Sequence, residues 1–243
     1  STAPTSYAQV ASGSWSMYAV VYNTTDGDLE LSGVQVGGFD ISESVYSQNF
    51  SVAAQDTTPT SLAFNNDGTK MFVMGYSGQD VLEYTLSAGF DVSTSTFVDS
   101  FSVLAQDSSP VGLAFNTDGT KMFICGTSGQ DVNEYALTTG FDVSTASFTR
   151  VFSVASQDTQ PYALSFNTDG TKMFVLGYTG QVVLEYTLST GFDVSTASYV
   201  DGFSVYSQDT QPTGLAFNTD GTKMFVVGNT GDDVNEYTLT TGF

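Results

Sequence analysis

The sequence repeats itself at a fixed interval of 51 residues. A Gly-Phe pair recurs without slippage, with its glycine at Gly38, Gly89, Gly140, Gly191 and Gly242. A second string, FNTDGTKMF, starts at Phe115, Phe166 and Phe217, and its near copy FNNDGTKMF starts at Phe64. A period of this length indicates one supersecondary unit per repeat, because such a unit buries its apolar face only against its neighbours.

Each period contains four strand candidates. In the third copy they are PYALSF (161–166), KMFVLGY (172–178), VVLEYTLS (182–189) and ASYVDGFSV (197–205), and the turn NTDG separates the first two. No segment keeps a period of 3.6, so helices should be nearly absent. Four antiparallel strands in 40–50 residues are typical of a β-propeller blade. The sequence therefore predicts an all-β propeller; the strongest alternative, a β-solenoid, usually has shorter units.

The string LAFNTDGTKMFVVG (215–228) is similar to the signature of YVTN/NHL-type β-propellers. That resemblance covers about residues 38–243 and implies the fold, while propellers host many unrelated functions. The segment NEYALTTGFDVSTASF (133–148) also resembles repeat arrays of marine bacteriophage structural proteins.

The phase of the repeat predicts how the propeller closes. Four whole periods separate Gly38 from Gly242, which predicts four blades in residues 38–243. The last copy stops where its fourth strand should begin, whereas residues 38–52 match that strand. Pairing of 44–52 with 233–240 would remove two open sheet edges. Residues 1–37 are then an N-terminal arm; the alternative is a degenerate fifth blade.

Residues 1–37 lack the repeat and hold the only tryptophan of the chain. A short hairpin cannot bury their apolar side chains by itself. We expect these side chains to bind a partner, either another virion or surface protein or a second copy in a homo-oligomer; they include Trp15, Met17, Tyr18 and Tyr22.

The 243 residues carry a net charge of −21, because 26 acidic residues face only 5 Lys and Arg. Such a surface disfavours nucleic acids and anionic lipid surfaces. No run of about 18 apolar residues exists, so no membrane insertion is expected. The first residues, STAPTSYAQV, have no basic or apolar signal region, so either an initiator Met or a whole signal was removed. The single Cys125 lies in an apolar run, which predicts a buried strand residue.

Two sets of aspartates recur in every copy. The set before the Pro-led strand would form a ring at one mouth of the channel and could hold Ca²⁺; it contains Asp56, Asp107, Asp158 and Asp209. The alternative is that each of them caps its own loop. The second set lies in the Asn-x-Asp-Gly turns, where a tight turn favours Asp and Gly, and metal binding is the weaker reading; it contains Asp67, Asp118, Asp169 and Asp220.

Other positions alternate between copies, as expected of a duplicated two-blade unit. The residue after the second strand is Tyr76, Thr127, Tyr178 or Asn229, and tyrosines there could stack on the faces of sugars. Lys70, Lys121, Lys172 and Lys223 each have a glutamate on the neighbouring strand, which predicts a cross-strand ion pair in each blade.

No His and no G-x-S-x-G motif is present. With every notable carboxylate repeated in each blade, we expect no enzymatic activity. The sequence predicts a structural or adhesion propeller of a phage virion, a tail or capsid decoration that binds a host surface or glycan. The alternatives are a secreted or cell-surface multivalent glycan-binding lectin and, more remotely, a lactonase-type enzyme.

Overall fold

The computed structural model describes residues 9–12, 15–18, 22–23, 29–30 and 45–242. The chain divides into two compact units, residues 1–47 and 48–243. In the first unit β1 (Gln9–Ser12) pairs with β2 (Trp15–Tyr18), and β3 (Tyr22–Asn23) pairs with β4 (Leu29–Glu30). The prediction of a fifth blade or an arm falls largely outside the described residues.

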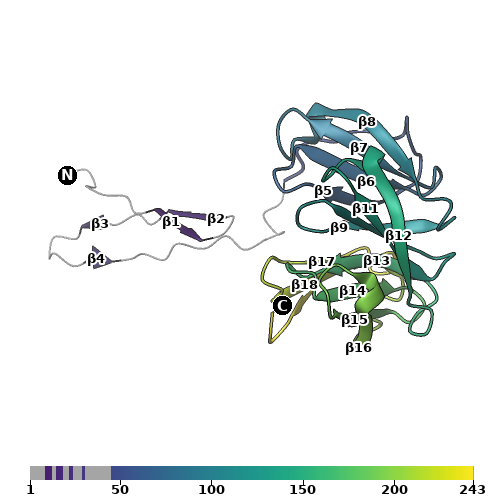
Figure 1. Cartoon of the computed structure of the whole chain (residues 1–243). Coiled ribbons are helices and arrows are strands. Elements are labelled where there is room, and N and C mark those ends of the chain that lie inside the picture. Colours follow the sequence, from purple (N-terminus) through teal and green to yellow (C-terminus); the bar gives the residue numbers. More distant parts are fainter. Residues whose placement is uncertain (1–8, 13–14, 19–21, 24–28, 31–44, 243) are drawn as a thin grey trace. The chain divides into compact units, whose positions relative to one another are not determined.

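The second unit is a β-propeller of four antiparallel blades (Figure 1). Blade 1 contains β5 (Pro59–Phe64), β6 (Lys70–Gly75), β7 (Asp80–Leu86) and β8 (Ser95–Ser102). Blade 2 contains β9 (Pro110–Phe115), β10 (Lys121–Gly126), β11 (Asp131–Leu137) and β12 (Ala146–Ser153). Blade 3 contains β13 (Pro161–Phe166), β14 (Lys172–Gly177), β15 (Val182–Leu188) and β16 (Ala197–Ser204). Blade 4 contains β17 (Pro212–Phe217), β18 (Lys223–Gly228) and β19 (Val234–Thr238). The all-β propeller and its four blades are confirmed.

Helix is almost absent, as predicted. The described part of the chain has 3₁₀ helices only as single turns, at Val92–Thr94, Val143–Thr145 and Val194–Thr196. Each follows an aspartate whose carboxylate accepts a hydrogen bond from the backbone two residues later; these aspartates are Asp91, Asp142 and Asp193. No helix in the described ranges is long and apolar enough to cross a membrane.

The two repeated strings meet in space, which explains why they recur together. In blade 1 the turn glycine, Gly68, has a φ of 71°, and a side chain there would lie 2.4 Å from the ring of Phe90. The backbone N–H of Phe90 also donates to the carbonyl of Gly68, at 3.0 Å. Glycine is required at this turn both by its backbone conformation and by the ring of the Gly-Phe pair packed against it. Blades 2 and 3 repeat this contact at Gly119 and Gly170.

Aromatic side chains hold neighbouring blades together. Between blades 2 and 3, Phe123 packs against Phe166 with ring centroids 4.5 Å apart, and Phe192 contacts both rings. Cys125 is fully buried in the same cluster, as predicted, and burial raises the pKa of its thiol to about 12.

The predicted pairing of 44–52 with 233–240 is not present among the described residues. Residues 45–52 have no regular strand structure, and among the described residues β19 pairs only with β18. Phe50 and Val52 instead pack against blade 1, where the ring of Phe50 lies 5.5 Å from that of Tyr84. In the part of the chain that the structure describes, blade 4 has three strands. The innermost strands of all four blades (β5, β9, β13, β17) line one central cavity of about 450 Å³.

Candidate functional site

The repeated aspartates before each inner strand are buried and capped by backbone amides. Asp107 is 2 % exposed, and its two carboxylate oxygens accept hydrogen bonds from the N–H of Ser109 at 2.6 Å and of Gly129 at 2.8 Å. The other three copies make equivalent bonds: Asp56, Asp158 and Asp209. Each carboxylate thus ties the loop before the inner strand to the turn after the second strand. This geometry is the capping alternative foreseen from the sequence.

No group of three or more His, Cys, Asp or Glu side chains suited to a metal ion occurs among the described residues. The Asp56 set accepts hydrogen bonds from backbone amides in every blade. Binding of Ca²⁺ to these aspartates stays a prediction.

A second carboxylate, which sequence reasoning did not single out, accompanies the capping aspartate in three of the blades. Asp80 and Asp131 are the first residues of the third strands of blades 1 and 2, and Asp233 immediately precedes the third strand of blade 4. Blade 3 has Val182 at this position instead of an aspartate. A side chain at Gly75 would meet carboxylate oxygens of both Asp56 and Asp80, at 2.7 and 2.9 Å, so these two carboxylates are near neighbours. The sequence offered one indication that these aspartates matter. Asparagines stand two residues after two of them, at Asn133 and Asn235.

Asp131 is the most perturbed of these carboxyls. Burial, followed by the negative charge of Asp107, raises the pKa of Asp131 to about 6. Asn133 donates from Nδ2 to Asp131 Oδ1 at 2.7 Å, which favours the ionised form but does not outweigh the burial. A carboxyl with such a pKa is ionised at neutral pH and still basic enough to accept a proton.

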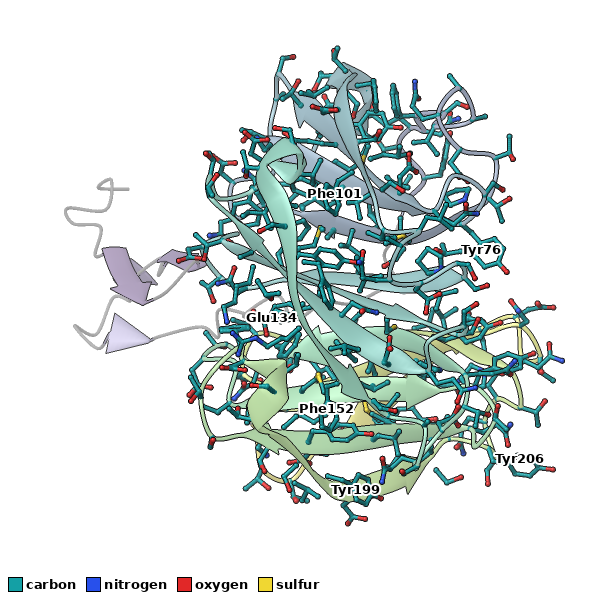
Figure 2. The ribbon with its side chains drawn as sticks, turned by 45° about the vertical axis from the view of Figure 1, so that its right-hand side comes forward. Tyr76, Phe101, Glu134, Phe152, Tyr199 and Tyr206 are labelled. Atoms are coloured by element: carbon teal, nitrogen blue, oxygen red, sulfur yellow. The ribbon has the colours of Figure 1, made fainter. Side chains whose placement is uncertain are left out.

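Three tyrosines gather at this same end of the propeller. Tyr76 follows β6 and Tyr178 follows β14, so the two come from blades 1 and 3. Tyr178 stacks on Tyr162, with ring centroids 4.6 Å apart and an angle of 21° between the planes. Burial raises the pKa of Tyr162, and the nearby hydroxyls of Tyr178 and then Tyr76 raise it further. The three tyrosines are therefore close neighbours. Tyr76 is 38 % exposed and lies at the rim (Figure 2).

The other two members of the alternating set also lie at this rim. Thr127 is partly buried and Asn229 is exposed. Tyr162 was missed because its position, the one after the strand-opening proline, varies between copies: Thr60, Val111, Tyr162 and Thr213.

The predicted Lys–Glu pairs are present in all four blades, and the glutamates of blades 1 and 2 also bind the blade that follows. Lys121 Nζ lies 2.9 Å from Glu134 Oε1, and Glu134 is 1 % exposed (Figure 2). The other oxygen of Glu134 accepts from the N–H of Val194 in blade 3 at 3.1 Å, while Lys121 donates to the carbonyl of Phe192 at 2.5 Å. The pair therefore clamps the next blade's 3₁₀ turn. Glu83 and Lys70 hold blade 2 in the same way.

All five cations of the chain are engaged in ion pairs. The four lysines bind the glutamates of their own blades, and Arg150 lies 3.7 Å from Glu134 and also binds Asp193. The lysines begin their strands, whereas Tyr76 and Tyr178 follow the ends of the same strands. The tyrosine end of the propeller consequently carries carboxylates and hydroxyls but no lysine.

The predicted partner-binding residues belong to the first unit. Trp15, Met17 and Tyr18 lie on β2, and Tyr22 begins β3. Their role in binding a partner stays a prediction.

Comparisons with known proteins support the fold. No family model matches the sequence, and no curated protein sequence matches it. Among solved structures, a candidate 6-phosphogluconolactonase from Bacteroides uniformis is similar, with a TM-score of 0.55 and 14% identity over 93% of this chain. A candidate 6-phosphogluconolactonase from Bacteroides fragilis has a TM-score of 0.55, 15% identity and the same coverage. The periplasmic gluconolactonase PpgL from Pseudomonas aeruginosa has a TM-score of 0.50 and 19% identity over 96% of this chain. The chain spans 62% of the length of each of these proteins.

These neighbours contradict the prediction of a non-enzymatic virion protein. All three carry lactonase names, and none of the three is a bacteriophage protein. The absence of histidine does not exclude a base, because a carboxyl with a raised pKa can also accept a proton. The finer resemblance to YVTN/NHL-type propellers finds no matching family and stays a prediction.

Proposed function

We propose that the protein is a lactonase-type propeller, an enzyme that hydrolyses the cyclic ester of an uncharged sugar acid at the tyrosine end of its channel. The observation that carries the proposal is the place of Asp131, a partly buried carboxylate held by Asn133 at the end of the propeller where Tyr162 and Tyr178 stack on each other. Burial raises its pKa to about 6, which suits a base. The lactonase names of three structural neighbours support the same reaction by analogy of fold.

In this proposal Asp131 acts as the general base. Its carboxylate removes a proton from a water molecule while the water oxygen bonds to the carbonyl carbon of the lactone. The ring C–O bond then breaks, the proton passes to the departing alkoxide, and the product is the open hydroxy acid. A base with a pKa near 6 is largely ionised at pH 7 and remains a competent proton acceptor. The tyrosine rings offer flat faces on which a sugar ring can stack, and their hydroxyls can bind its oxygens.

The charge distribution selects an uncharged substrate. The net charge is −21, and all five Lys and Arg side chains are held in ion pairs. A phosphate group would enter a negative field without a cation to receive it. We therefore expect the unphosphorylated lactone to be the better substrate.

The test is proton release from glucono-δ-lactone and from its 6-phosphate, each corrected for spontaneous hydrolysis. The expected result is a rate above background for the unphosphorylated lactone and a loss of at least tenfold in Asp131→Asn. Asp233→Asn is the matched control, because Asp233 also accepts from an asparagine two residues later, Asn235, at 2.8 Å. A rate no greater than background, or equal rates in the wild type and Asp131→Asn, would refute the proposal.

A further inference from the structure

The dipeptide Asp-Gly occurs at two kinds of place in the propeller. Four copies lie in the turns between the first and second strands of the blades, and they begin at Asp67, Asp118, Asp169 and Asp220. One further copy, Asp201 and Gly202, lies within the outer strand of blade 3, β16. Glycine has no side chain to shield its amide nitrogen, so the surroundings of each pair decide how that nitrogen can react.

In the turns the carboxylate and the glycine amide are each bound to a third group. Asp67 Oδ1 accepts hydrogen bonds from the N–H of Thr69 at 3.0 Å and from its hydroxyl at 2.6 Å. These bonds lower the pKa of Asp67, so its carboxyl stays ionised. The N–H of Gly68 donates to the carbonyl of Asn65 at 3.1 Å, and Gly68 is buried. The other three turns repeat these bonds and the burial of the glycine.

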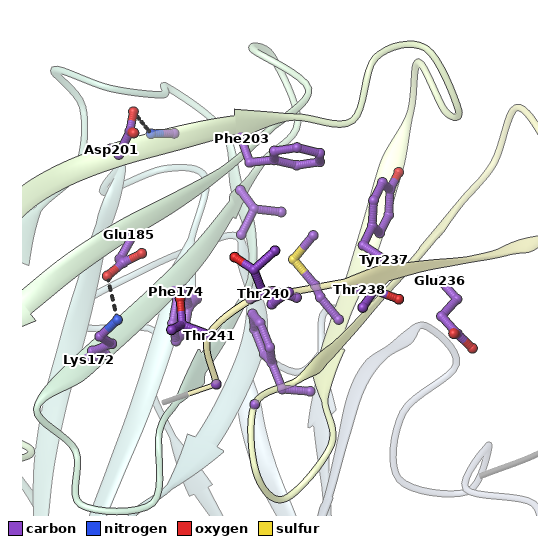
Figure 3. Close-up of a pocket in the computed structure, with 17 residues that line it drawn as sticks. Lys172, Phe174, Glu185, Asp201, Phe203, Glu236, Tyr237, Thr238, Thr240 and Thr241 are labelled. Carbon is purple, nitrogen blue, oxygen red and sulfur yellow. Dashed lines mark hydrogen bonds and ion pairs between the residues drawn. The ribbon is translucent and has the colours of Figure 1, made fainter. Parts of the chain in front are cut away.

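Asp201 and Gly202 are bound to each other instead. The N–H of Gly202 donates to Asp201 Oδ1 at 2.8 Å (Figure 3). Both residues are exposed, and none of the ion pairs in the described part of the chain includes Asp201. The carboxyl carbon of the aspartate therefore lies beside the glycine nitrogen, and no third group holds either of them apart.

A β-bulge stands directly before this pair. In the pairing of β15 with β16, Tyr186 faces Tyr199 and Glu185 faces Asp201, so Val200 is the extra residue. A bulge alters the local course of its strand and can aim a side chain differently from its neighbours. We attribute the contact between the aspartate and the next amide to this local geometry.

Blade 1 repeats the contact with a different second residue. There the N–H of Ser100 donates to Asp99 Oδ1 at 2.7 Å, and Asp99 faces Glu83 in the same bulged register. Asp99 and Ser100 are exposed although a four-stranded blade follows them, so exposure belongs to this position of the outer strand. Serine carries a β-carbon next to its amide, whereas Gly202 does not.

We propose that Asp201 is a site of spontaneous isoaspartate formation, with the amide of Gly202 as the nucleophile. The nitrogen of Gly202 bonds to the side-chain carboxyl carbon of Asp201, the amide proton leaves, and one carboxyl oxygen departs as water. Water then adds to the resulting succinimide ring. Cleavage of the new C–N bond restores aspartate, and cleavage of the original peptide C–N bond gives isoaspartate. Water is the only co-reactant, and the step does not depend on the proposed hydrolysis of lactones.

The modification falls where it affects the contact between two blades. Isoaspartate adds one carbon atom to the main chain of β16, just before residues 202–204, which pair with β15. Phe203 lies in that stretch, and its ring packs on Tyr237 of blade 4 with centroids 5.4 Å apart. A longer main chain shifts the register of these residues, so the contact between blades 3 and 4 loosens as the protein ages.

The test compares two aspartates within one peptide. The full chain is incubated in its folded state at neutral pH and then cleaved with trypsin after Lys172 and Lys223, which yields residues 173–223 with both Asp201 and Asp220. Electron-transfer fragmentation locates isoaspartate within the peptide. We expect about tenfold more isoaspartate at Asp201 than at Asp220. In the urea-unfolded chain, where the folded contacts are lost, both aspartates should react at similar rates.

Two variants examine the geometry itself. Asp201→Glu should give no product at this position, because a glutamate would have to close a larger ring. Ser100→Gly places an Asp-Gly pair in the same contact of blade 1 and should create a second reactive position at Asp99, measured against Asp118 in the peptide of residues 71–121. Equal levels at Asp201 and Asp220 in the folded protein, whether high or undetectable, would overturn the proposal. No gain at Asp99 in Ser100→Gly would also overturn it.

Discussion

Replacing Asp80 by valine should stabilise the protein, although it removes a charged residue from a repeated motif. The change makes β7, DVLEYTL, identical to β15, VVLEYTL, in which Val182 stands at this position. The two residues have matching register, Asp80 opposite Gly75 and Val182 opposite Gly177. Blade 3 shows that the propeller accepts valine here next to its capping aspartate.

The expected gain follows from an unsatisfied oxygen. Asp80 Oδ1 is buried and has no hydrogen-bond partner. Burial, and then the charge of Asp56, raises the pKa of Asp80. Leaving a buried polar atom unsatisfied costs about 1–3 kcal/mol. Because Asp80 is partly exposed, we expect Asp80→Val to raise the free energy of unfolding by about 1–2 kcal/mol at pH 7.5. For a chain of this length that is roughly 2–6 °C in melting temperature.

The gain should depend on pH in a defined direction. A carboxyl whose pKa is higher in the folded than in the unfolded state binds protons more readily when folded. Wild-type stability therefore falls as the pH rises from the ordinary value of 3.8 through the raised folded pKa, and the variant escapes this loss. Calorimetry at pH 7.5 and near pH 3.8 should show the larger difference at pH 7.5.

The control is the same substitution in blade 2. Asp131→Val also removes a carboxyl with a raised pKa, but it leaves the amide of Asn133, which is 2 % exposed, without its acceptor. That loss should cancel the gain. The reasoning fails if Asp80→Val lowers the melting temperature at pH 7.5, if its gain is as large near pH 3.8, or if Asp131→Val stabilises equally.

Three further outcomes are expected. Glu134→Gln should lower the free energy of unfolding in urea by about 3–5 kcal/mol, because it removes the charge that holds two blades together. The Glu236 side chain is 49% exposed, so Glu236→Gln should cost less than about 1 kcal/mol. Equal costs would contradict the clamp. Phe192→Ala should cost about 3–5 kcal/mol in the same assay because its ring contacts Phe123 and Phe166, and a cost below 1 kcal/mol would show that this contact is dispensable. Calcium and EDTA should give the same melting temperature, because backbone amides already occupy both oxygens of Asp107 and its copies; a shift of many degrees would restore the metal site.

Strand positions were highly predictable because the repeat supplies its own comparison. The third copy was expected to form strands at 161–166, 172–178, 182–189 and 197–205, and β13 to β16 differ from these by at most one residue at their ends. Four aligned copies show which positions always carry a turn residue, so local ambiguity largely disappears. The closing strand was not found among the described residues, because sequence similarity shows what a segment can pair with but not whether the pair forms.

The candidate site was harder to predict, because its properties arise from burial. Asp131 begins a strand directly after a turn, a position at which an aspartate is expected to be exposed. Its desolvation depends on the side chains packed around it, which the sequence does not show. Glu134 looked like half of a surface ion pair, yet it is 1 % exposed and binds the following blade. Tyr162 stacks on Tyr178 of the neighbouring strand. This contact depends on strand pairing, and comparison of the four repeats does not indicate it.

Residues that are identical in every copy and residues that differ have separate roles in this propeller. The repeated positions of Asp107 and of the Gly-Phe pair cap loops and pack against turns throughout the propeller, and Glu83 and Glu134 also clamp the following blade. Tyr76, Tyr162 and Asp131 depart from strict repetition, and all three lie at one end of the strands. A reaction needs an asymmetric arrangement of groups around one substrate, which identical blades cannot provide by themselves. The departures from the repeat are therefore the positions at which substitution should alter the proposed activity while leaving the fold intact.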